Sequence, residues 1–358
     1  MNMQTQQPGM KAKPDIGKSV STFFINMKDS PFLNRKITDK SRLFVIEASP
    51  GTMKIERSEP TKAVLIAPVG INVGEDLREL ASGLEIGWGS YESGKYNSNV
   101  VGGVLSGLWA AAGSIKGATI SGVGGTYVRR TVDGLMMGIS NIVGTAVNGV
   151  MIGAGNRTKK LMGMAAGAVN VADEIIGAAM SIILTHVNEL VRGLVVSGFW
   201  SGLYGDVDGV AVTGIGTMVE GKVRGIIVTG VATSIHKEPR RRSGEVGVDG
   251  AVVSGVGTYI EGDVKGAAMS GLVTYISKTL HGFGMGLVNY AEAVVGLRIG
   301  LVNIVKEPTP AWSVDLGLVN INLHEKSLLK RYTPILSVRW KGKKVEAGGN
   351  ADDLARAA

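Results

Sequence analysis

Apolar and polar positions follow one another along this chain in a unit that returns with a fixed period. The unit reads Val-x-Gly, three apolar residues, Ser or Thr, then Gly, and its copies begin at Val191, Val207, Val223, Val248, Val264 and, in degenerate form, Leu280. The starts lie 16 residues apart, except for one step of 25 residues that contains the insertion 237–245. A period this short predicts a stack of similar units, none of which buries its apolar face alone.

Each unit predicts two short strands joined at two corners. Residues three to five after the start are apolar, and a second apolar position follows at Leu203, Val219, Ile235, Ile260 and Ile276. β-Branched residues favour strands, whereas the Gly at the eighth position and the Glu-Gly-Lys or Glu-Gly-Asp corners favour turns. We therefore predict an all-β fold, a flattened parallel β-solenoid of about 13 coils of 14–17 residues each.

A column of charged residues indicates how successive coils are oriented. The position after the first Val holds, in order, Arg192, Asp208, Arg224, Asp249, Lys265 and His281, and Lys116 and Asp133 occupy it earlier in the chain. Parallel stacking places such residues about 4.8 Å apart, where opposite charges attract. An antiparallel meander would place them at alternate ends of neighbouring strands, so the column favours parallel coils.

The repeat also sets the boundaries of the array. A looser glycine column continues towards the N-terminus, and we assign the solenoid to residues 84–305. We predict an N-terminal β-rich cap at 20–83, with a short helix at 76–84, and a C-terminal cap at 306–345 whose residues 311–340 form two or three closing strands. Residues 1–19 and 346–358 are predicted to be tails. The looser column runs through Gly103, Gly117, Gly134, Gly149, Gly163 and Gly177.

Composition and spacing argue against an enzyme. Gly accounts for 53 of 358 residues, and Cys is absent, which excludes disulfides and thiolate metal sites. Carboxylates gather only at the corners, as at Asp206 and Glu261, and a calcium site there is an alternative that the neighbouring Lys222 opposes. We find no set of nucleophile, base and orienting residue, and predict neither catalysis nor a cofactor. The four histidines are scattered without metal-ligand spacing: His186, His236, His281 and His324.

Two basic features are candidate interaction sites. The formal net charge is +8 and the pI is about 9.5, a balance that favours acidic partners without selecting one. Either feature is suited to phosphate, acidic lipid or an acidic protein, and a solvated, solubilising role is the alternative. The first is Arg240, Arg241 and Arg242 in the insertion, and the second is Lys330, Arg331, Arg339, Lys341, Lys343 and Lys344 near the C-terminus.

Two further patterns leave alternatives open. A Ser/Thr column at the seventh position and a second one at the eleventh predict hydroxyl ladders, which either bond neighbouring coils or order a ligand. Residues 134–156 carry no charge, so a membrane-spanning helix is an alternative there, although the glycine column continues through them. The ladders are Ser197, Thr213, Thr229, Ser254 and Ser270, and Ser201, Thr217, Thr233, Thr258 and Thr274.

One part of the chain is similar to a known family. Residues 280–305 contain Gly-Met-Gly-Leu-Val-Asn and then Val-Gly-Leu-Arg-Ile-Gly-Leu-Val-Asn. This segment resembles the bacterial surface-repeat family built from Gly-Leu-x-x-Gly-Leu-x-Asn units, and the likeness extends over about residues 84–322. The resemblance implies an envelope or surface protein without known enzymatic activity. The Glu-Gly-Lys and Glu-Gly-Asp corners resemble, more weakly, those of polymerising bactofilin coils, which implies filaments.

We predict a non-enzymatic structural protein that self-associates, as a homo-oligomer or filament, through an apolar flank of the solenoid. Three consecutive apolar positions in each copy imply that an outer face is apolar as well as the core, and exposed apolar faces of this length dock against something. The alternative is an envelope- or membrane-associated protein that binds lipid or glycolipid through the flank and the basic C-terminal segment. We predict no specific nucleic acid. No secretory signal pattern is visible in residues 1–26, which leaves a cytoplasmic or envelope-associated location.

Overall fold

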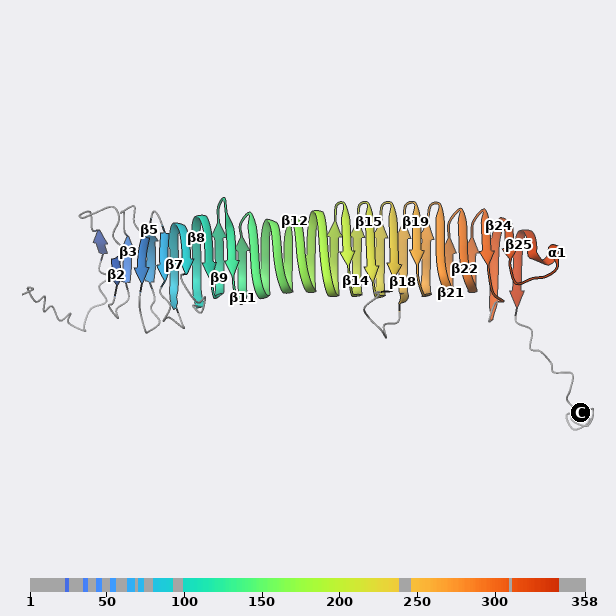
Figure 1. Cartoon of the computed structure of the whole chain (residues 1–358), viewed down its shortest axis with the longest axis horizontal. Helices are drawn as coiled ribbons and strands as arrows, with labels where there is room; N and C mark the ends of the chain where they lie inside the picture. The colour runs from blue at the N-terminus through green and yellow to red at the C-terminus, as the bar shows by residue number, and fades with distance from the viewer. Residues whose placement is uncertain are drawn as a thin grey trace, which may run out of the picture.

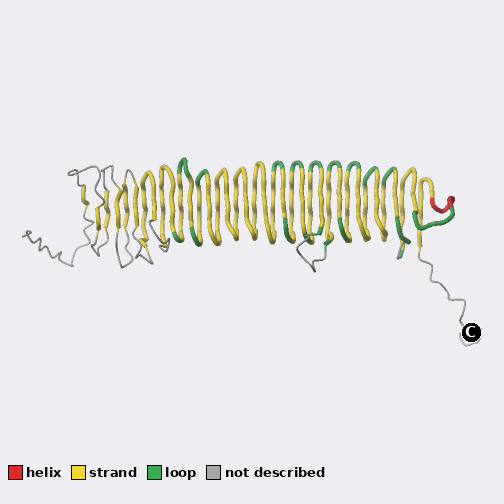
Figure 2. The backbone as a smooth tube through the Cα atoms, in the orientation of Figure 1, coloured by secondary structure: helices red, strands yellow, loops and turns green. Residues whose placement is uncertain are grey.

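The protein is a long rod of stacked β-coils (Figures 1 and 2). Each coil passes once along each of two opposed sheets, and the next coil lies directly against it. The insertion after Lys237 and the two tails, 1–19 and 346–358, fall outside the described residues. The computed structural model describes residues 23–25, 35–37, 43–46, 52–55, 63–67, 70–73, 80–92, 99–237, 246–308 and 311–340.

The strands follow one another with short corners between them. The first strands are β1 (Phe23–Ile25), β2 (Arg35–Ile37), β3 (Leu43–Ile46), β4 (Thr52–Ile55), β5 (Ala63–Ala67), β6 (Gly70–Val73), β7 (Leu80–Glu92), β8 (Asn99–Ala112), β9 (Ser114–Ser121), β10 (Gly125–Val128) and β11 (Thr131–Met137). The middle of the rod is β12 (Ser140–Ser197), which runs through several coils without interruption. After it come β13 (Trp200–Leu203), β14 (Asp206–Thr213), β15 (Gly216–Glu220), β16 (Lys222–Thr229), β17 (Ala232–His236), β18 (Gly247–Ser254), β19 (Gly257–Ile260), β20 (Asp263–Ser270), β21 (Val273–Met285), β22 (Val288–Ile299), β23 (Val302–Val305), β24 (Trp312–Asn322) and β25 (Tyr332–Trp340).

The coils stack in parallel, and the charged column confirms the prediction of a parallel β-solenoid. Arg192 pairs with Asp208, which pairs with Arg224 in the next coil. The same register continues through Asp249 and Lys265 to His281. Arg192 Nε lies 3.8 Å from Asp208 Oδ2. Residues 134–156 belong to β11, a corner and β12, so the alternative of a spanning helix in this segment is wrong.

The stacking extends towards the N-terminus beyond residue 84. β1 pairs in parallel with β3, β3 with β5, and β5 with β7. The predicted helix at 76–84 is wrong over residues 80–84, which lie in β7, while 76–79 lie outside the described residues. The glycine column passes through Gly102 and not the predicted Gly103, because Gly102 pairs with Gly117 and, one coil earlier, with Gly83.

The core is a file of aliphatic side chains that each touch the coils above and below. The first Val of each repeat is buried, as are the residues four and twelve positions later, for example Val191, Val195 and Leu203. Full burial of one such side chain contributes about 1.5–3 kcal/mol. Because every contact is with an adjacent coil, stability adds up along the rod as nearest-neighbour terms.

The glycine column holds the coils at their spacing. Thirteen glycines of this column, from Gly102 to Gly296, have φ between +125° and +153°, a region that side chains disfavour. From Gly117 onwards, a Cβ at each would lie 2.0–2.2 Å from the carbonyl oxygen of the glycine one coil earlier. Both the dihedral angle and the close approach therefore require Gly.

The hydroxyl columns lie inside the rod and bond one coil to the next. Ser254 Oγ donates to Thr233 Oγ1 at 2.8 Å across the coils, and Thr233 Oγ1 donates to Thr229 Oγ1 at 2.9 Å within one coil. All ten predicted hydroxyls belong to residues at most 4% exposed. The two columns thus form one internal ladder, and the alternative that they order an external ligand is wrong.

Corners that are one residue shorter close with Asn in place of these hydroxyls. Thr126 pairs with Asn141, and Thr274 with Asn289, so the amide occupies the hydroxyl position. Asn289 Nδ2 donates both to Asn303 Oδ1 at 2.8 Å and to the Ile299 carbonyl at 2.9 Å. The longer amide side chain reaches the main chain of a corner that has fewer residues. Two such ladders occur: Asn141, Asn156 and Asn170, and Asn289, Asn303 and Asn320.

The C-terminal end of the stack is closed by two elements. β24 continues the parallel stacking on β22 and β23. The single-turn helix α1 (Leu328–Arg331) then reverses the chain, and β25 returns antiparallel along β24. The prediction of two or three closing strands in residues 311–340 agrees with these two strands.

We expect Gly225→Ala to destabilise the rod strongly. Its φ is +136°, and the new Cβ would lie 2.0 Å from the Gly209 carbonyl oxygen. The free energy of unfolding should fall by about 3 kcal/mol, measured by chemical denaturation. Gly257→Ala is the matched control, because its Cβ would meet only the Val273 oxygen at 3.9 Å. Equal stability of the two variants would contradict this account of the column.

Candidate interaction surface

One edge of the rod is apolar from Leu105 to Leu318. We call it the apolar edge, and it lies where the upper corners stand in Figure 2. It combines two columns of outward side chains. The first follows the glycine column by three residues: Leu105, Ile120, Met137, Ile152, Ala166, Met180, Val196, Val212, Val228, Val253, Met269, Met285, Ile299 and Leu316. The second stands at the corners: Leu108, Val123, Ile139, Ile182, Phe199, Ile215, Val231, Val256, Leu272, Leu287, Leu301 and Leu318.

The apolar edge carries no charged side chain in either column. The corner residues named above are 40–71% exposed. They stack in register, since Val231 donates its N–H to the Ile215 carbonyl at 3.1 Å and Val256 donates to Val231 at 2.8 Å. A large exposed apolar surface is unusual for a soluble monomer.

The opposite edge is charged, and its carboxylates hold the corners together. Asp206 Oδ1 accepts the N–H of Lys222 at 3.0 Å, and Asp263 Oδ1 accepts that of Thr279 at 3.1 Å. Glu261 Oε2 accepts the Lys237 N–H at 3.1 Å. Corner carboxylates therefore cap main-chain donors of a neighbouring coil, the following one for Asp206 and Asp263 and the preceding one for Glu261. Among the described residues, no group of three or more His, Asp or Glu side chains is placed to hold a metal ion.

A cavity of about 500 Å³ opens on this charged edge where the insertion leaves the rod. It forms because Gly247 stands in the column between Lys222 and Asp263, and so provides no side chain there. Positive and negative groups nearly balance around it, which does not favour one ligand charge. Its charged lining residues are Lys222, Lys237, Lys265, Lys278, Asp249, Glu261 and Asp263.

The predicted basic residues do not come together as one patch. Lys330 is exposed on α1, and Arg331 beside it is half-buried. Arg339 points into the end of the rod. The other candidates, Arg240, Arg241, Arg242, Lys341, Lys343 and Lys344, lie outside the described residues.

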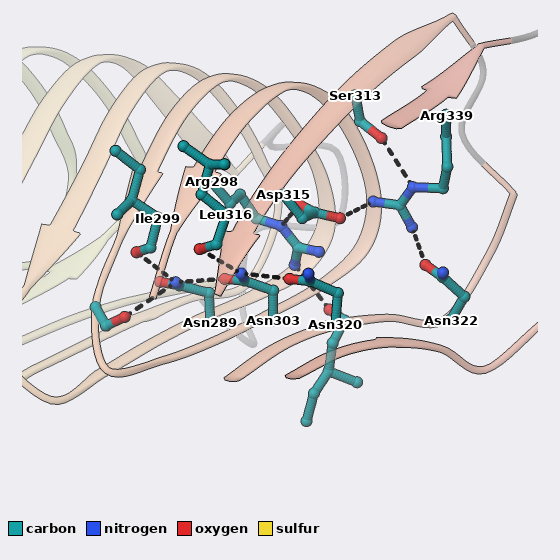
Figure 3. A network of polar contacts seen from close by, with 12 residues as sticks. Asn289, Arg298, Ile299, Asn303, Ser313, Asp315, Leu316, Asn320, Asn322 and Arg339 are labelled. Carbon is teal, nitrogen blue, oxygen red and sulfur yellow. Dashed lines mark hydrogen bonds and ion pairs between the residues drawn. The ribbon is translucent and has the colours of Figure 1, made fainter. Parts of the chain in front are cut away.

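Arg339 belongs to a buried ionic network that ends the stack (Figure 3). Arg298 Nε donates to Asp315 Oδ1 at 2.7 Å, and both side chains are only 1% exposed. Arg339 donates to Asp315 Oδ2 from the other side, to Asn322 Oδ1, and to Ser313 Oγ at 2.9 Å. One carboxylate thus joins the last coils to β25.

Arg298 occupies a position that is apolar in most coils. Its column contains Ile227, Val252 and Ala268, and then Gly284 directly before it. A Cβ on Gly284 would meet the Arg298 side chain at 3.2 Å, so this glycine makes room for it. The sequence analysis did not single out Arg298. The signal available for it was a charged residue in an otherwise apolar column, with the opposite charge of Asp315 at the same position of the next coil.

Burial lowers the pKa of the Arg339 guanidinium from its usual value, and the Asp315 carboxylate opposes that shift. The Arg298 charge, on the far side of Asp315, acts in the same direction as burial. Asp315 therefore balances two guanidinium groups. The network is a structural closure and has no exposed group available for chemistry.

Other ordered side chains on the surface are also structural. Tyr259, Tyr275 and Tyr290 stack face to face, with ring centroids 5.2 Å and 4.6 Å apart. Their ring faces cover one another, so they present edges and not a platform to solvent. No helix among the described residues combines the length and apolar character needed to cross a membrane.

In comparisons with known proteins, no family model, curated protein or solved structure matches this chain. The resemblance to the surface-repeat family and to bactofilin coils therefore stays a prediction.

We expect Asp315→Ala to loosen the C-terminal coils selectively. Removing the carboxylate leaves Arg298 charged and buried, which costs about 3–5 kcal/mol. Hydrogen exchange of β24 and β25 amides should accelerate, while amides of β14 and β16 keep their protection, because coils couple only to neighbours.

Glu292→Ala is the control for this variant. It removes an ion pair with Lys306 of the same 2.7 Å length, whose side chains are 54% and 28% exposed. Exposed pairs contribute little, so exchange in β24 and β25 should stay as in the parent. Unchanged exchange in Asp315→Ala would show that the network does not hold the end closed.

Proposed function

We propose that this protein is a non-enzymatic structural rod that associates side by side with a second copy through the apolar edge. The observation that carries the proposal is the charge-free course of the two columns of this edge from Leu105 to Leu318. The self-association predicted from the sequence thereby acquires a specific surface.

The dimensions of the edge suit a specific protein interface. About 13 coils spaced about 4.8 Å apart extend over roughly 60 Å, and packed sheets lie about 10 Å apart. Two such edges together offer on the order of 1,200 Å², the lower end of the range for specific protein interfaces. Covering a surface of this size also removes the cost of leaving it in water.

The charges beside the edge favour a protein partner over a lipid surface. An interfacial element that binds anionic lipid carries Lys and Arg along its polar face. Here the nearest charged column alternates in sign, with Arg192, Asp208, Arg224 and Asp249 in successive coils. Lipid or glycolipid binding is therefore the second outcome of the test below.

The C-terminal closure supports side-by-side association over end-to-end filaments. β25 covers β24 in antiparallel orientation, so a parallel coil of another molecule finds no free strand there. Pro334 and the adjacent register shift opposite Gly317–Asn320 interrupt the outer edge of β25. Proline and bulges are common devices against strand addition at edges.

We expect the double variant Ile215→Lys/Val256→Lys to abolish dimerisation. Both side chains are exposed on the apolar edge, and two buried ammonium groups without partners oppose association. Sedimentation velocity should give a dimer for the parent and a monomer for the variant, with identical circular dichroism spectra.

Asn148→Lys/His281→Lys is the control, because it adds the same number of lysines in the charged column. It should remain dimeric. A monomeric parent that floats with liposomes of neutral and anionic phospholipid would instead establish the lipid alternative, and a monomeric parent that ignores liposomes would overturn both.

A further inference from the structure

We infer that the two copies lie antiparallel, with a two-fold axis crossing the apolar edge between the coil of Gly163 and the coil of Gly177. This inference rests on the proposed function and specifies its geometry. Its basis is that the outward side chains at the corners of the apolar edge are small in the two coils before this boundary and large in the two coils after it.

A ridge of large side chains stands on the two coils after this boundary. Ile182 is 69% exposed, Ile183 49%, Phe199 55% and Trp200 43%. These coils are 16 residues long, counted from Gly177 to Gly193 and from Gly193 to Gly209. The ridge is a dense group of large, exposed apolar side chains on the edge.

A depression occupies the two coils before the boundary. Their corners consist of small residues, Gly153–Gly155 and Ala166–Ala168. A Cβ on Gly155 would find no atom within 4 Å, so the space above it is open. These coils run for 14 residues each, from Gly149 to Gly163 and on to Gly177, so they have two residues fewer than the ridge coils.

Ridge and depression are arranged so that one rotation fits both. A two-fold axis at the boundary brings the ridge of each copy onto the depression of the other, which makes two identical contacts. Parallel pairing in register would set ridge against ridge and leave the depressions empty. Close packing of apolar surfaces favours the antiparallel arrangement.

The boundary is also the midpoint of the rod. Nine coils precede it: those that contain β1, β3, β5 and β7, and those that contain Gly102, Gly117, Gly134, Gly149 and Gly163. Nine coils follow it: those that contain Gly177, Gly193, Gly209, Gly225, Gly250, Gly266, Gly282 and Gly296, and the coil that contains β24. Two antiparallel copies therefore overlap from end to end.

The three coil pairs next to the ridge and the depression make apolar contacts as well. Counting coils outward from the axis places Ile139 opposite Ile215 of the second copy, Val123 opposite Val231, and Leu108 opposite Val256. Each of these six residues is exposed on the apolar edge. None of these six residues is charged.

Cysteine cross-linking tests the orientation, since the chain has no Cys of its own. Val123→Cys and Val231→Cys are prepared separately, mixed, and treated with a short bis-maleimide. Antiparallel pairing places Val123 opposite Val231, so the mixture should yield cross-linked dimers of one variant with the other. Each variant alone should yield none, because its two cysteines lie seven coils apart, about 34 Å.

The outcomes separate the orientation from the proposed function. Cross-linked dimers of either variant alone, in a protein that sediments as a dimer, would establish parallel pairing and overturn this inference only. A dimer that is not cross-linked in the mixture would also overturn it. A protein that sediments as a monomer would overturn the proposed function itself.

A second variant tests the fit of ridge and depression. Ala168→Phe fills the depression with a large side chain, whereas Leu272→Phe places the same residue on an exposed corner far from the axis. The first should raise the dimer dissociation constant by at least tenfold, and the second should leave it within about twofold. Equal dissociation constants would overturn the proposed contact.

Discussion

The close approach of glycine to glycine is the constraint on which the rest of this structure depends. A Cβ at Gly225 would lie 2.0 Å from the carbonyl oxygen of Gly209, and the same contact recurs in coil after coil. Because the main chains come this close at one column, every other column is held in register. Val above Val, hydroxyl above hydroxyl and Arg above Asp are consequences of that register.

Within this register, the side chains that close a corner differ with the number of residues in that corner. A Ser/Thr pair closes the 16-residue coils, whereas a single Asn with a longer reach closes the 14-residue coils, as at Asn156 and Asn289. The interior therefore tolerates both lengths, because each buried polar group still finds a partner.

The columns made most of the fold predictable from the sequence. Alternating charges at Arg192 and Asp208 attract one another only if successive coils are parallel, and this attraction indicated the stacking direction.

The start of the array was harder to predict, because Gly102 and Gly103 are adjacent and only the strand pairing distinguishes them. The ionic closure was missed because Arg298 stands within one repeat and its partners Asp315 and Arg339 stand in segments without any repeat. Three consecutive apolar positions in each copy indicated an apolar outer face, but which of these side chains are exposed could be read only from the structure.

The antiparallel strand β25 has a consequence for the order of folding. It follows in the chain all the coils that it covers, so β24 is synthesised before its cover exists. Until Arg339 reaches Asp315, the newest coil presents an open parallel edge to the nascent chains around it. The C-terminal end of the rod therefore remains open to strand addition until the residues up to Trp340 have been synthesised and β25 has paired with β24.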